Sequence, residues 1–442
     1  MTEEQIFEIC QKENVKFINL QFSDVLGISK AVTIPYTKLK SAIHNNVWFD
    51  GSSIEGFTRI FESDQFLKPD LDTFAVIPWT IGTESVTARI ICDVFLPDGQ
   101  PFKGDPRYIL KNQVKRAEEM GYTFYTGPEL EFFLFKKENG HIEPLPHDRG
   151  GYFDQSTDQA AEVRKEMSLA LQMMGIDVET LHHEVAIGQH EIDFKYNKAL
   201  MCADNAITFK LVLKAIAAKY DLHATFMPKP IAGINGSGMH VHQSLFKGDE
   251  NAFYDDAENY KLSKVAKQYI AGQLAHMKEI CAVTNPVVNS YKRLVVGYEA
   301  PVYLAWGQVN RSALIRIPRF TEGNKKGARI ELRSPDPSCN PYLAFAVMLA
   351  AGLDGIEKGM TPPEPLDENI YDFDDAKIKQ LNIENLPIDL GRALNEFKKS
   401  QLVRETLGDH TYKVFYEAKK KEWDSYRTSV SKWELDRYLE IY

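Results

Sequence analysis

Four segments of this chain alternate apolar and ionisable residues with a period of two. In "GPELEFFLF" (127–135), Glu129 and Glu131 alternate with Leu130 and Phe132. A period of two is typical of a β-strand, because successive side chains point to opposite faces of a sheet. Both carboxylates are therefore predicted to share one face of a strand, with the apolar residues on the other.

The other three segments repeat the pattern with different polar groups. These groups are Glu191 and Asp193 in "HEIDF", His240, His242 and Ser244 in "GMHVHQSLF", and Arg329, Glu331 and Arg333 in "ARIELRSPD". Any one segment, taken singly, is better explained by an edge strand with a wet outer face. Together they argue against it, because a wet face usually mixes Lys, Thr, Ser and Glu. We therefore predict one sheet whose polar face lines a cavity.

If the strands share a sheet, five carboxylates and one imidazole surround this cavity. They are Glu129, Glu131, Glu184, Glu191, His240 and Glu331. Adjacent carboxylates raise each other's pKa, so five cannot all ionise unless cations neutralise them. A donor set of carboxylates and one imidazole suits Mg²⁺ or Mn²⁺, and the missing thiolates argue against zinc. The sequence therefore predicts a magnesium or manganese site.

The histidine-rich stretch "HHEVAIGQHEIDF" (182–194) belongs to the same interpretation. It is not the motif of a zinc peptidase, because the position four after His183 is Ile187. We expect His182 and His183 to lie behind the metal ligands or in the core.

Basic residues follow in the segments "NRSALIRIPRF" and "NKKGARIELR". They are Arg311, Arg316, Lys326, Arg329 and Arg333. Arginines beside divalent cations are the components of phosphoryl transfer, in which a protein positions phosphates and neutralises developing charge. The chain has no G-x-x-x-x-G-K-[ST], and "GSGMHV" lacks the third glycine of the dinucleotide fingerprint. A nucleotide held by the sheet itself is predicted.

Composition excludes several classes of protein. With 442 residues, of which 44% are hydrophobic and 26% charged, the chain has an ordinary globular composition with room for two or three domains. Its net charge of −10 argues against nucleic-acid binding, which needs a basic face. Five scattered cysteines without a C-x-x-C pair indicate reduced thiols.

Two further stretches bear on location. The start "MTEEQIFEIC" lacks the basic and apolar regions of a secretory signal, so we expect a cytoplasmic protein. The longest apolar run, "PYLAFAVMLAAGL" (341–353), is too short to cross a bilayer and predicts a buried helix. No membrane span is expected.

A Pro-, Gly- and Asp-rich joint, "LPDGQPFKGDP" (96–106), predicts a domain boundary near residue 103. It divides the chain into residues 1–103, which hold short strand-like runs, and residues 104–442, in which strands alternate with helices. Helices are expected at 107–121, 159–174, 204–219, 258–283 and 341–357. From about 390 the charged helical pattern predicts a solvated helical surface.

Seven motifs in this order resemble the signatures of type I glutamine synthetases. They are "WFDGSSIEGF", "GPELEFFLF", "HHEVAIGQHEIDF", "NGSGMHVHQSLF", "GYEAP", "NRSALIRIP" and "RIELRSPDPSCNPYLAF". The resemblance runs from about residue 15 to the end, and the short span between Glu131 and Glu184 is similar to the bacterial and archaeal I-alpha class. It implies an α+β fold, with a β-grasp-like N-terminal domain and a catalytic domain whose curved antiparallel sheet is flanked by helices.

The resemblance also implies an activity and an assembly. The activity is ATP-dependent ligation of ammonia to the γ-carboxylate of glutamate through γ-glutamyl phosphate, with at least two Mg²⁺ or Mn²⁺ ions per site. The assembly is a dodecamer of two hexameric rings with active sites between subunits. Glutamate, ammonium and ATP are the implied small-molecule partners, and nitrogen-regulatory proteins come into consideration as protein partners.

Carried over motif by motif, the resemblance assigns roles to individual residues. One metal would be held by Glu131, Glu184 and Glu191, and the other by Glu129, His240 and Glu331. Catalytic roles fall to Asp50, which would take a proton from ammonium, to the flap residue Glu299 and to Arg311. Glutamate would be bound by Asn235, Gly236, Arg293 and Arg333. ATP would be bound by Glu179, His242, Ser244, Arg311, Arg316, Lys326 and Arg329.

Regulation is implied at two positions. Arg59, in "GFTRIFESD", resembles an arginine linked to feedback inhibition by glutamine, with a surface salt-bridge residue as the alternative. Tyr371, in "ENIYDF", stands where a different bacterial class carries an adenylylated tyrosine. Because the other features resemble the class without this modification, we expect none.

Three other functions stay open from the sequence. They are a related γ-glutamyl ligase that uses another amine, a non-catalytic sensor on the same fold, and a divalent-metal phosphohydrolase. The acid of "DGSSIEGF" favours ammonia as the acceptor. The presence of all six metal-ligand residues argues against the sensor.

Overall fold

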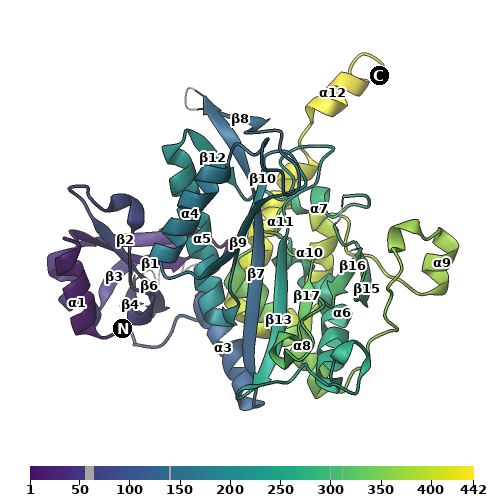
Figure 1. Cartoon of the computed structure of the whole chain (residues 1–442), viewed down its shortest axis with the longest axis horizontal. Coiled ribbons are helices and arrows are strands. Elements are labelled where there is room, and N and C mark those ends of the chain that lie inside the picture. Colours follow the sequence, from purple (N-terminus) through teal and green to yellow (C-terminus); the bar gives the residue numbers. More distant parts are fainter. Residues whose placement is uncertain (55–63, 139–140, 299, 311) are drawn as a thin grey trace.

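The computed structural model describes residues 1–54, 64–138, 141–298, 300–310 and 312–442. The chain begins with a six-stranded sheet in the order β2-β1-β6-β4-β3, with β5 paired to β6 (Figure 1). Its strands are β1 (Phe17–Ser23), β2 (Ser29–Pro35), β3 (Val47–Asp50), β4 (Asp64–Pro69), β5 (Ala75–Val76) and β6 (Thr87–Phe95). The strands β1 and β6 are parallel, and helix α1 (Glu3–Lys12) buries Ile6 and Cys10 in the same core as Ile18. This is the predicted β-grasp-like arrangement.

The second sheet has eleven strands and is built around the long strand β7 (Thr123–Glu138). Its main order is β15-β16-β17-β13-β7-β10-β9, and its pairs are antiparallel except for β15 with β16. The other strands are β8 (His141–Pro146), β9 (Val178–His183), β10 (Gln189–Phe194), β11 (Asn197–Lys198), β12 (Leu222–Thr225), β13 (Met239–Lys247), β14 (Glu250–Asn251), β15 (Tyr303–Gly307), β16 (Ala313–Arg316) and β17 (Ile330–Leu332). All four alternating segments contribute strands to this one sheet, which confirms the α+β prediction.

Helices cover the apolar side of this sheet. They are α3 (Pro106–Glu119), α4 (Ala161–Met173), α5 (Ala199–Lys219), α6 (Lys264–Thr284) and α8 (Pro341–Glu357). All five were predicted, although α6 begins later than expected because Tyr260 has a φ of 57° and Ser263 caps the helix through the amide of Ala266. The remaining α-helices of the described residues are α2 (Leu39–His44), α7 (Ser290–Arg293), α9 (Asp375–Gln380), α10 (Leu390–Lys399), α11 (Gln401–Arg427) and α12 (Lys432–Tyr438).

The buried helix predicted from the longest apolar run is α8, in which Leu343, Phe345 and Leu349 are fully buried. Among the described residues, no helix combines the length and the apolar character that crossing a membrane requires. All five cysteines are buried and unbridged, as expected.

The predicted solvated surface after residue 390 is wrong for part of this region. Helices α10 and α11 bury Leu394, Phe397 and Phe415 in the main core, where α10 packs on α6 and α11 packs on α8. Charged residues separate these apolar positions in the sequence and conceal their helical spacing. Helix α12 stands away from the body of the chain (Figure 1).

One buried arginine joins the N-terminal sheet to helix α5, which packs on the second sheet. The predicted boundary near residue 103 lies in the connection between β6 and α3, and Arg107 follows it in the first turn of α3. Its guanidinium contacts Asp93 at 2.7 Å and Asp70 at 2.6 Å from the N-terminal part, and Asp204 of α5 at 2.9 Å. Burial alone would raise the pKa of Asp93, but Arg107 and Lys111 lower it. Arg107 therefore pairs with three carboxylates that meet at this joint.

We expect Arg107→Met to lower the free energy of unfolding by about 3–5 kcal/mol, because it removes the buried guanidinium that three carboxylates share and leaves only Lys111 beside Asp93. Chemical denaturation followed by circular dichroism measures the effect. The matched control is Arg116→Met in the same helix, whose pair with Glu357 is partly exposed and contributes at most about 1 kcal/mol. Equal losses in both variants would contradict the role given to Arg107.

Candidate active site

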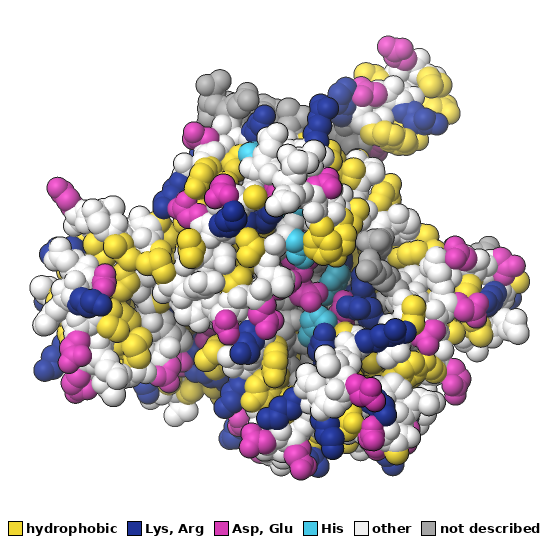
Figure 2. Space-filling model, in the orientation of Figure 1, with side chains coloured by type: hydrophobic (Ala, Val, Ile, Leu, Met, Phe, Trp, Pro, Cys, Tyr) yellow, Lys and Arg dark blue, Asp and Glu magenta, His cyan; other side chains and the backbone are white. Residues whose placement is uncertain are grey.

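Strand register brings the predicted metal ligands onto one surface. Directly opposite residues of an antiparallel pair point to the same face of the sheet. Glu131 is opposite Glu191, and Glu129 is opposite His240. Glu331 is opposite His242. Figure 2 shows histidine and acidic side chains gathered near the centre of this face, with basic side chains beside them.

Glu129 and Glu331 form one group with two histidines. Glu129 Oε1 lies 2.7 Å from Nε2 of His242, while Nδ1 of His240 lies 3.6 Å from Glu129 Oε2 and 3.8 Å from Glu331 Oε1. Ligand atoms of Glu129, His242 and Glu331 all lie within 4.8 Å of one another. The residues predicted for the second metal are therefore adjacent, and His242 lies closer to Glu129 than His240 does.

Glu184 and Glu191 form a second group. Their ligand atoms and one of His182 lie within 4.8 Å of one another, and Nε2 of His182 is 3.0 Å from Glu184 Oε1. Glu131, the third predicted ligand, accepts hydrogen bonds from Gln189 Nε2 at 3.0 Å and from the amide of Gly238 at 2.8 Å. His182 was expected behind the ligands, but its ring nitrogen lies among them.

Two carboxyl groups at this second group, those of Glu131 and Glu191, resist ionisation. Burial and the neighbouring Glu184 raise the pKa of Glu131 to about 8. Burial, Asp193 and then Glu131 raise the pKa of Glu191 well above its ordinary value. A divalent cation would neutralise these two groups in place of the protons that they otherwise retain. The donor set of carboxylate oxygens and imidazole therefore fits Mg²⁺ or Mn²⁺.

Basic residues border the other group. Arg316 is opposite Glu331 in the sheet and hydrogen-bonded to it, and Arg333 Nη1 lies 3.4 Å from Glu331 Oε1. Burial opposes ionisation of Glu331, but Arg333 and His242 lower its pKa. This part of the site therefore combines ionised carboxylates with arginines that can face phosphate oxygens.

The predicted glutamate-binding residues lie beside Glu131. Arg293 is buried and donates from Nη1 to the carbonyl of Ser334 at 2.7 Å, which fixes its orientation. A Cβ at Gly238 would lie 2.4 Å from Arg293 Nη2, so the loop approaches Arg293 as only glycine permits. Asn235 and Gly236 belong to this loop, and the carbonyl of Gly236 accepts from Gln189, which also donates to Glu131.

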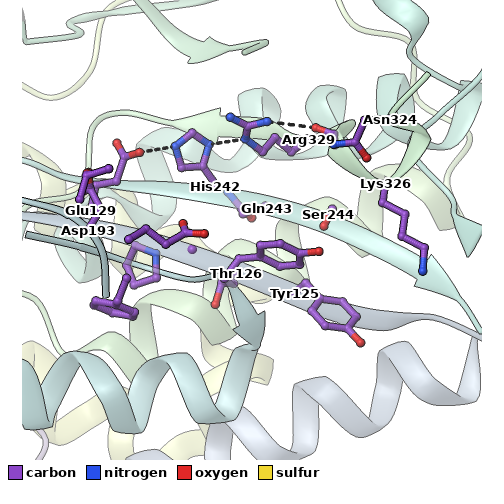
Figure 3. Close-up of a pocket in the computed structure, with 17 residues that line it drawn as sticks. Tyr125, Thr126, Glu129, Asp193, His242, Gln243, Ser244, Asn324, Lys326 and Arg329 are labelled. Carbon is purple, nitrogen blue, oxygen red and sulfur yellow. Dashed lines mark hydrogen bonds and ion pairs between the residues drawn. The ribbon is translucent and has the colours of Figure 1, made fainter. Parts of the chain in front are cut away.

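A pocket of about 360 Å³ adjoins Glu129 and His242 and lies within the usual size range of small-molecule sites. Among the residues that line it are five that were assigned to ATP, namely Glu179, His242, Ser244, Lys326 and Arg329. Figure 3 shows Glu129, His242 and Arg329 linked in a row, with Ser244 and Lys326 farther along the pocket. Arg316 does not line it.

Two tyrosines of this pocket were missed in the sequence. Tyr125 and Tyr196 have ring centroids 5.9 Å apart and line the wall together with Phe194. Tyr125 lies four residues before Glu129 in the same strand, so the period of two could have identified it. Tyr196 follows β10 and has no such signal, because only the fold brings it to Tyr125.

Four further residues were predicted to act in catalysis or regulation. Arg59, Glu299 and Arg311 lie outside the described residues. Asp50 ends β3, where its Oδ1 accepts from the amide of Ser52 at 2.8 Å. Figure 1 places β3 in the N-terminal sheet, to one side of the strands that carry the metal-ligand residues.

Comparison with known families covers nearly the whole chain. The model of the glutamine synthetase β-grasp domain matches residues 14–97, and that of the glutamine synthetase catalytic domain matches residues 103–438. This chain belongs to the glutamine synthetase family. The resemblance predicted from the seven motifs is confirmed.

Similar proteins support the family assignment at full length. Glutamine synthetase of Thermotoga maritima is 53% identical over 444 residues, covering 99% of this chain and 100% of the relative. Glutamine synthetase of Methanosarcina mazei is 54% identical over 442 residues, covering 100% and 98%.

Solved structures of the family share the fold. A structure described as a GmaS/ADP complex has a TM-score of 0.90 at 31% identity and covers 100% of both chains. The cryo-EM structure of Plasmodium falciparum glutamine synthetase has a TM-score of 0.87 at 25% identity, with 99% of each chain covered.

Proposed function

We propose that this chain is an ATP-dependent glutamate–ammonia ligase that forms glutamine, ADP and phosphate through γ-glutamyl phosphate. The observation that carries the proposal is the register of four strands, which aligns two groups of metal-ligand residues beside a nucleotide-sized pocket. Full-length relatives named glutamine synthetase, at 53–54% identity, support the proposal.

Two divalent cations, Mg²⁺ or Mn²⁺, would be held by Glu131, Glu184 and Glu191 and by Glu129, His240 and Glu331. When bound, they supply charge neutralisation for phosphate oxygens and for glutamate. His182 and His242 lie close enough to join these ligand sets. The arrangement suits phosphoryl transfer, in which the protein mainly orients charged groups.

ATP would lie along the pocket. Ser244, Lys326, Arg329 and Glu179 supply polar contacts, and Tyr125 and Tyr196 offer flat faces for a base. The ADP named for a structural relative with a TM-score of 0.90 agrees with this proposal. Arg316 and Arg311 would face the phosphates.

Glutamate would bind between this pocket and the loop before β13. Asn235 and Gly236 would hold its amino end, and Arg293 and Arg333 would bind its carboxylates. Arg311 would stabilise charge during transfer of the γ-phosphoryl group to the glutamate side chain. Glu299 would close over the intermediate and exclude water, which would otherwise hydrolyse it.

Asp50 would take a proton from ammonium, because only neutral ammonia has a lone pair to attack the acyl phosphate. The position of β3 to one side of the metal-ligand strands supports an Asp50 that serves a neighbouring subunit (Figure 1). We accordingly propose a cytoplasmic dodecamer of two hexameric rings, with residues 1–103 of one subunit completing the site in residues 104–442 of the next.

The test is an assay of phosphate and glutamine formation from ATP and glutamate with Mg²⁺ or Mn²⁺. We expect phosphate release to require glutamate and to rise with ammonium, with glutamine as the product. Phosphate release without glutamate would indicate a phosphohydrolase instead. Faster turnover with a primary amine than with ammonium would favour the related γ-glutamyl ligase, and no turnover at all would favour a sensor.

Regulation by glutamine gives a separate prediction. We expect Arg59→Ala to lose inhibition by glutamine with little change in turnover, because Arg59 would bind the inhibitor rather than the substrates. Initial rates at rising glutamine concentration measure this, with Lys40→Ala, an exposed change in the same domain, as the control. Inhibition that is unchanged in the Arg59 variant would remove the proposal.

Adenylylation is not proposed for Tyr371. Its hydroxyl donates a hydrogen bond to the carbonyl of Ala300, and the side chain is partly buried. Modification would have to break this contact. Incubation with an adenylyltransferase and mass spectrometry should detect no added nucleotide.

A further inference from the structure

The hairpin of β9 and β10 carries two proposed metal ligands, Glu184 after β9 and Glu191 within β10. A buried group of polar side chains, which the proposed reaction does not use, lies behind it. The group consists of Asp148, Asp158, Arg164, His183 and His190, all buried except for the partly exposed backbone around Asp158. The side chains of Asp148 and His183 have no exposed surface.

Asp148 holds the two sides of the hairpin turn together. It comes from the loop after β8, and its Oδ1 accepts from Nε2 of His183 at 2.9 Å and from the amide of Gly188 at 3.1 Å. Its Oδ2 accepts from the amide of Gln159 at 3.2 Å. Since Glu184 lies between His183 and Gly188, one carboxylate fixes the segment that carries this ligand.

His183 links Asp148 to the backbone of Glu184 through hydrogen bonds. Its Nε2 faces the carboxylate of Asp148, and its Nδ1 lies 2.6 Å from the carbonyl oxygen of Glu184. Both partners are hydrogen-bond acceptors, so both ring nitrogens must donate. The ring therefore bridges Asp148 to the backbone of a proposed metal ligand.

The packing around this bridge leaves no room for adjustment. A Cβ at Gly150 would lie 2.8 Å from the ring of His183. Gly188 has a φ of +69°, and a Cβ there would lie 2.9 Å from Pro146. The end of β8 and the loop after it thus approach the turn and the ring at distances that only glycine permits at positions 188 and 150. A second buried pair, Arg164 with Asp158, supports His190 beside Glu191.

A third metal site is the competing explanation, because ligand atoms of Asp148, His183 and His190 lie within 4.8 Å of one another. The hydrogen bonds argue against it. Arg164 Nη1 is 2.9 Å from Nδ1 of His190, which must then accept and leaves the proton on Nε2. His183 has donors on both nitrogens, so neither histidine offers a lone pair to a cation.

We propose that Asp148 and His183 are positioning residues that fix Glu184 for binding a divalent cation. The inference rests on the proposed function, because it requires a cation at Glu131, Glu184 and Glu191. Hydrogen-bond partners behind a ligand orient it, and their loss typically weakens metal affinity about 10- to 100-fold.

The test compares Asp148→Asn and His183→Gln with the parent enzyme. Titration with Mn²⁺, followed by the electron paramagnetic resonance of free Mn²⁺, gives the number and affinity of the sites. We expect one class of sites to weaken about 10- to 100-fold while the other stays unchanged. The Mg²⁺ concentration for half-maximal activity should rise in parallel.

The matched control is His147→Gln. His147 adjoins Asp148, and its ring nitrogens have no hydrogen-bond partner among the described residues. It should leave both classes of Mn²⁺ sites unchanged. Thermal melting of all variants separates loss of fold from loss of metal, and His183→Gln decides the matter if Asp148→Asn does not fold.

Each other outcome overturns the inference. Lower melting temperature with unchanged Mn²⁺ affinity would make the group purely structural. Complete loss of a third equivalent of Mn²⁺, with two tight sites retained, would make it a metal site. If the parent enzyme binds no divalent cation, the proposed function itself fails; parent binding with unaffected variants refutes the positioning role alone.

Discussion

Glu331→Gln should lower the turnover number about a thousand-fold, or about 4 kcal/mol in activation free energy. Glu331 is 1% exposed and lies opposite His242 in the sheet, within reach of His240, Arg316 and Arg333. Removing its charge takes an anionic oxygen from the proposed metal and leaves two arginines without their shared partner. Glutamine keeps the shape of the side chain, so the change is mainly electrostatic.

Initial-rate assays at saturating ATP, glutamate and ammonium measure this loss, together with circular dichroism and size-exclusion chromatography of the variant. Glu131→Ala should show a comparable loss, because it removes a ligand of the other proposed metal. The control is Glu357→Gln, a partly exposed carboxylate paired with Arg116. A folded Glu331→Gln enzyme with near-normal turnover in Mg²⁺ would refute the two-metal assignment.

Mixed oligomers of Asp50→Ala and Glu331→Ala subunits should regain activity that neither parent has. In a head-to-tail ring, each site takes Asp50 from one subunit and Glu331 from its neighbour. Random mixing at equal amounts then makes about one quarter of the sites intact, since each of two independent subunits contributes the needed residue half the time. Because neither parent oligomer is active, the recovered activity is easy to detect.

The subunits are dissociated, mixed and reassembled, and native mass spectrometry confirms that mixed oligomers form. The controls are each parent reassembled alone and a mixture of Asp50→Ala with Asp50→Ala,Glu331→Ala subunits, which has no intact combination. Confirmed mixed oligomers that stay as inactive as the parents would show that Asp50 serves its own chain.

Periodicity predicted most of the fold, because burial acts on long, regular segments. The apolar run 341–353 lies in the buried helix α8. The four alternating segments form the strands β7, β10, β13 and β17 of one sheet. The prediction of buried segments is wrong where apolar positions are sparse in the sequence. Phe397 and Phe415 are separated by charged residues, yet both are buried. A narrow stripe of apolar side chains is enough for α10 to pack on α6 and for α11 to pack on α8.

Part of the candidate site was also accessible from sequence. Alternation alone selected Glu129, Glu131, Glu191 and Glu331, since it reports which face a side chain occupies. It does not report which strands are neighbours or how they are aligned. Three contacts depend on that alignment. His182 approaches Glu184, Gln189 donates hydrogen bonds to Glu131 and to the carbonyl of Gly236, and the ring of Tyr125 contacts that of Tyr196.

The pairing of β7 restricts how this family can diverge. Glu131 is matched to β10 and Glu129 to β13, so one strand aligns both halves of the site. A single inserted residue between them would turn one carboxylate into the apolar core and bring a core side chain to the cavity. We infer that β7 can change by substitution over evolutionary time but not by insertion or deletion between Tyr125 and Phe133. Changes in chain length must accumulate in the connections outside that span.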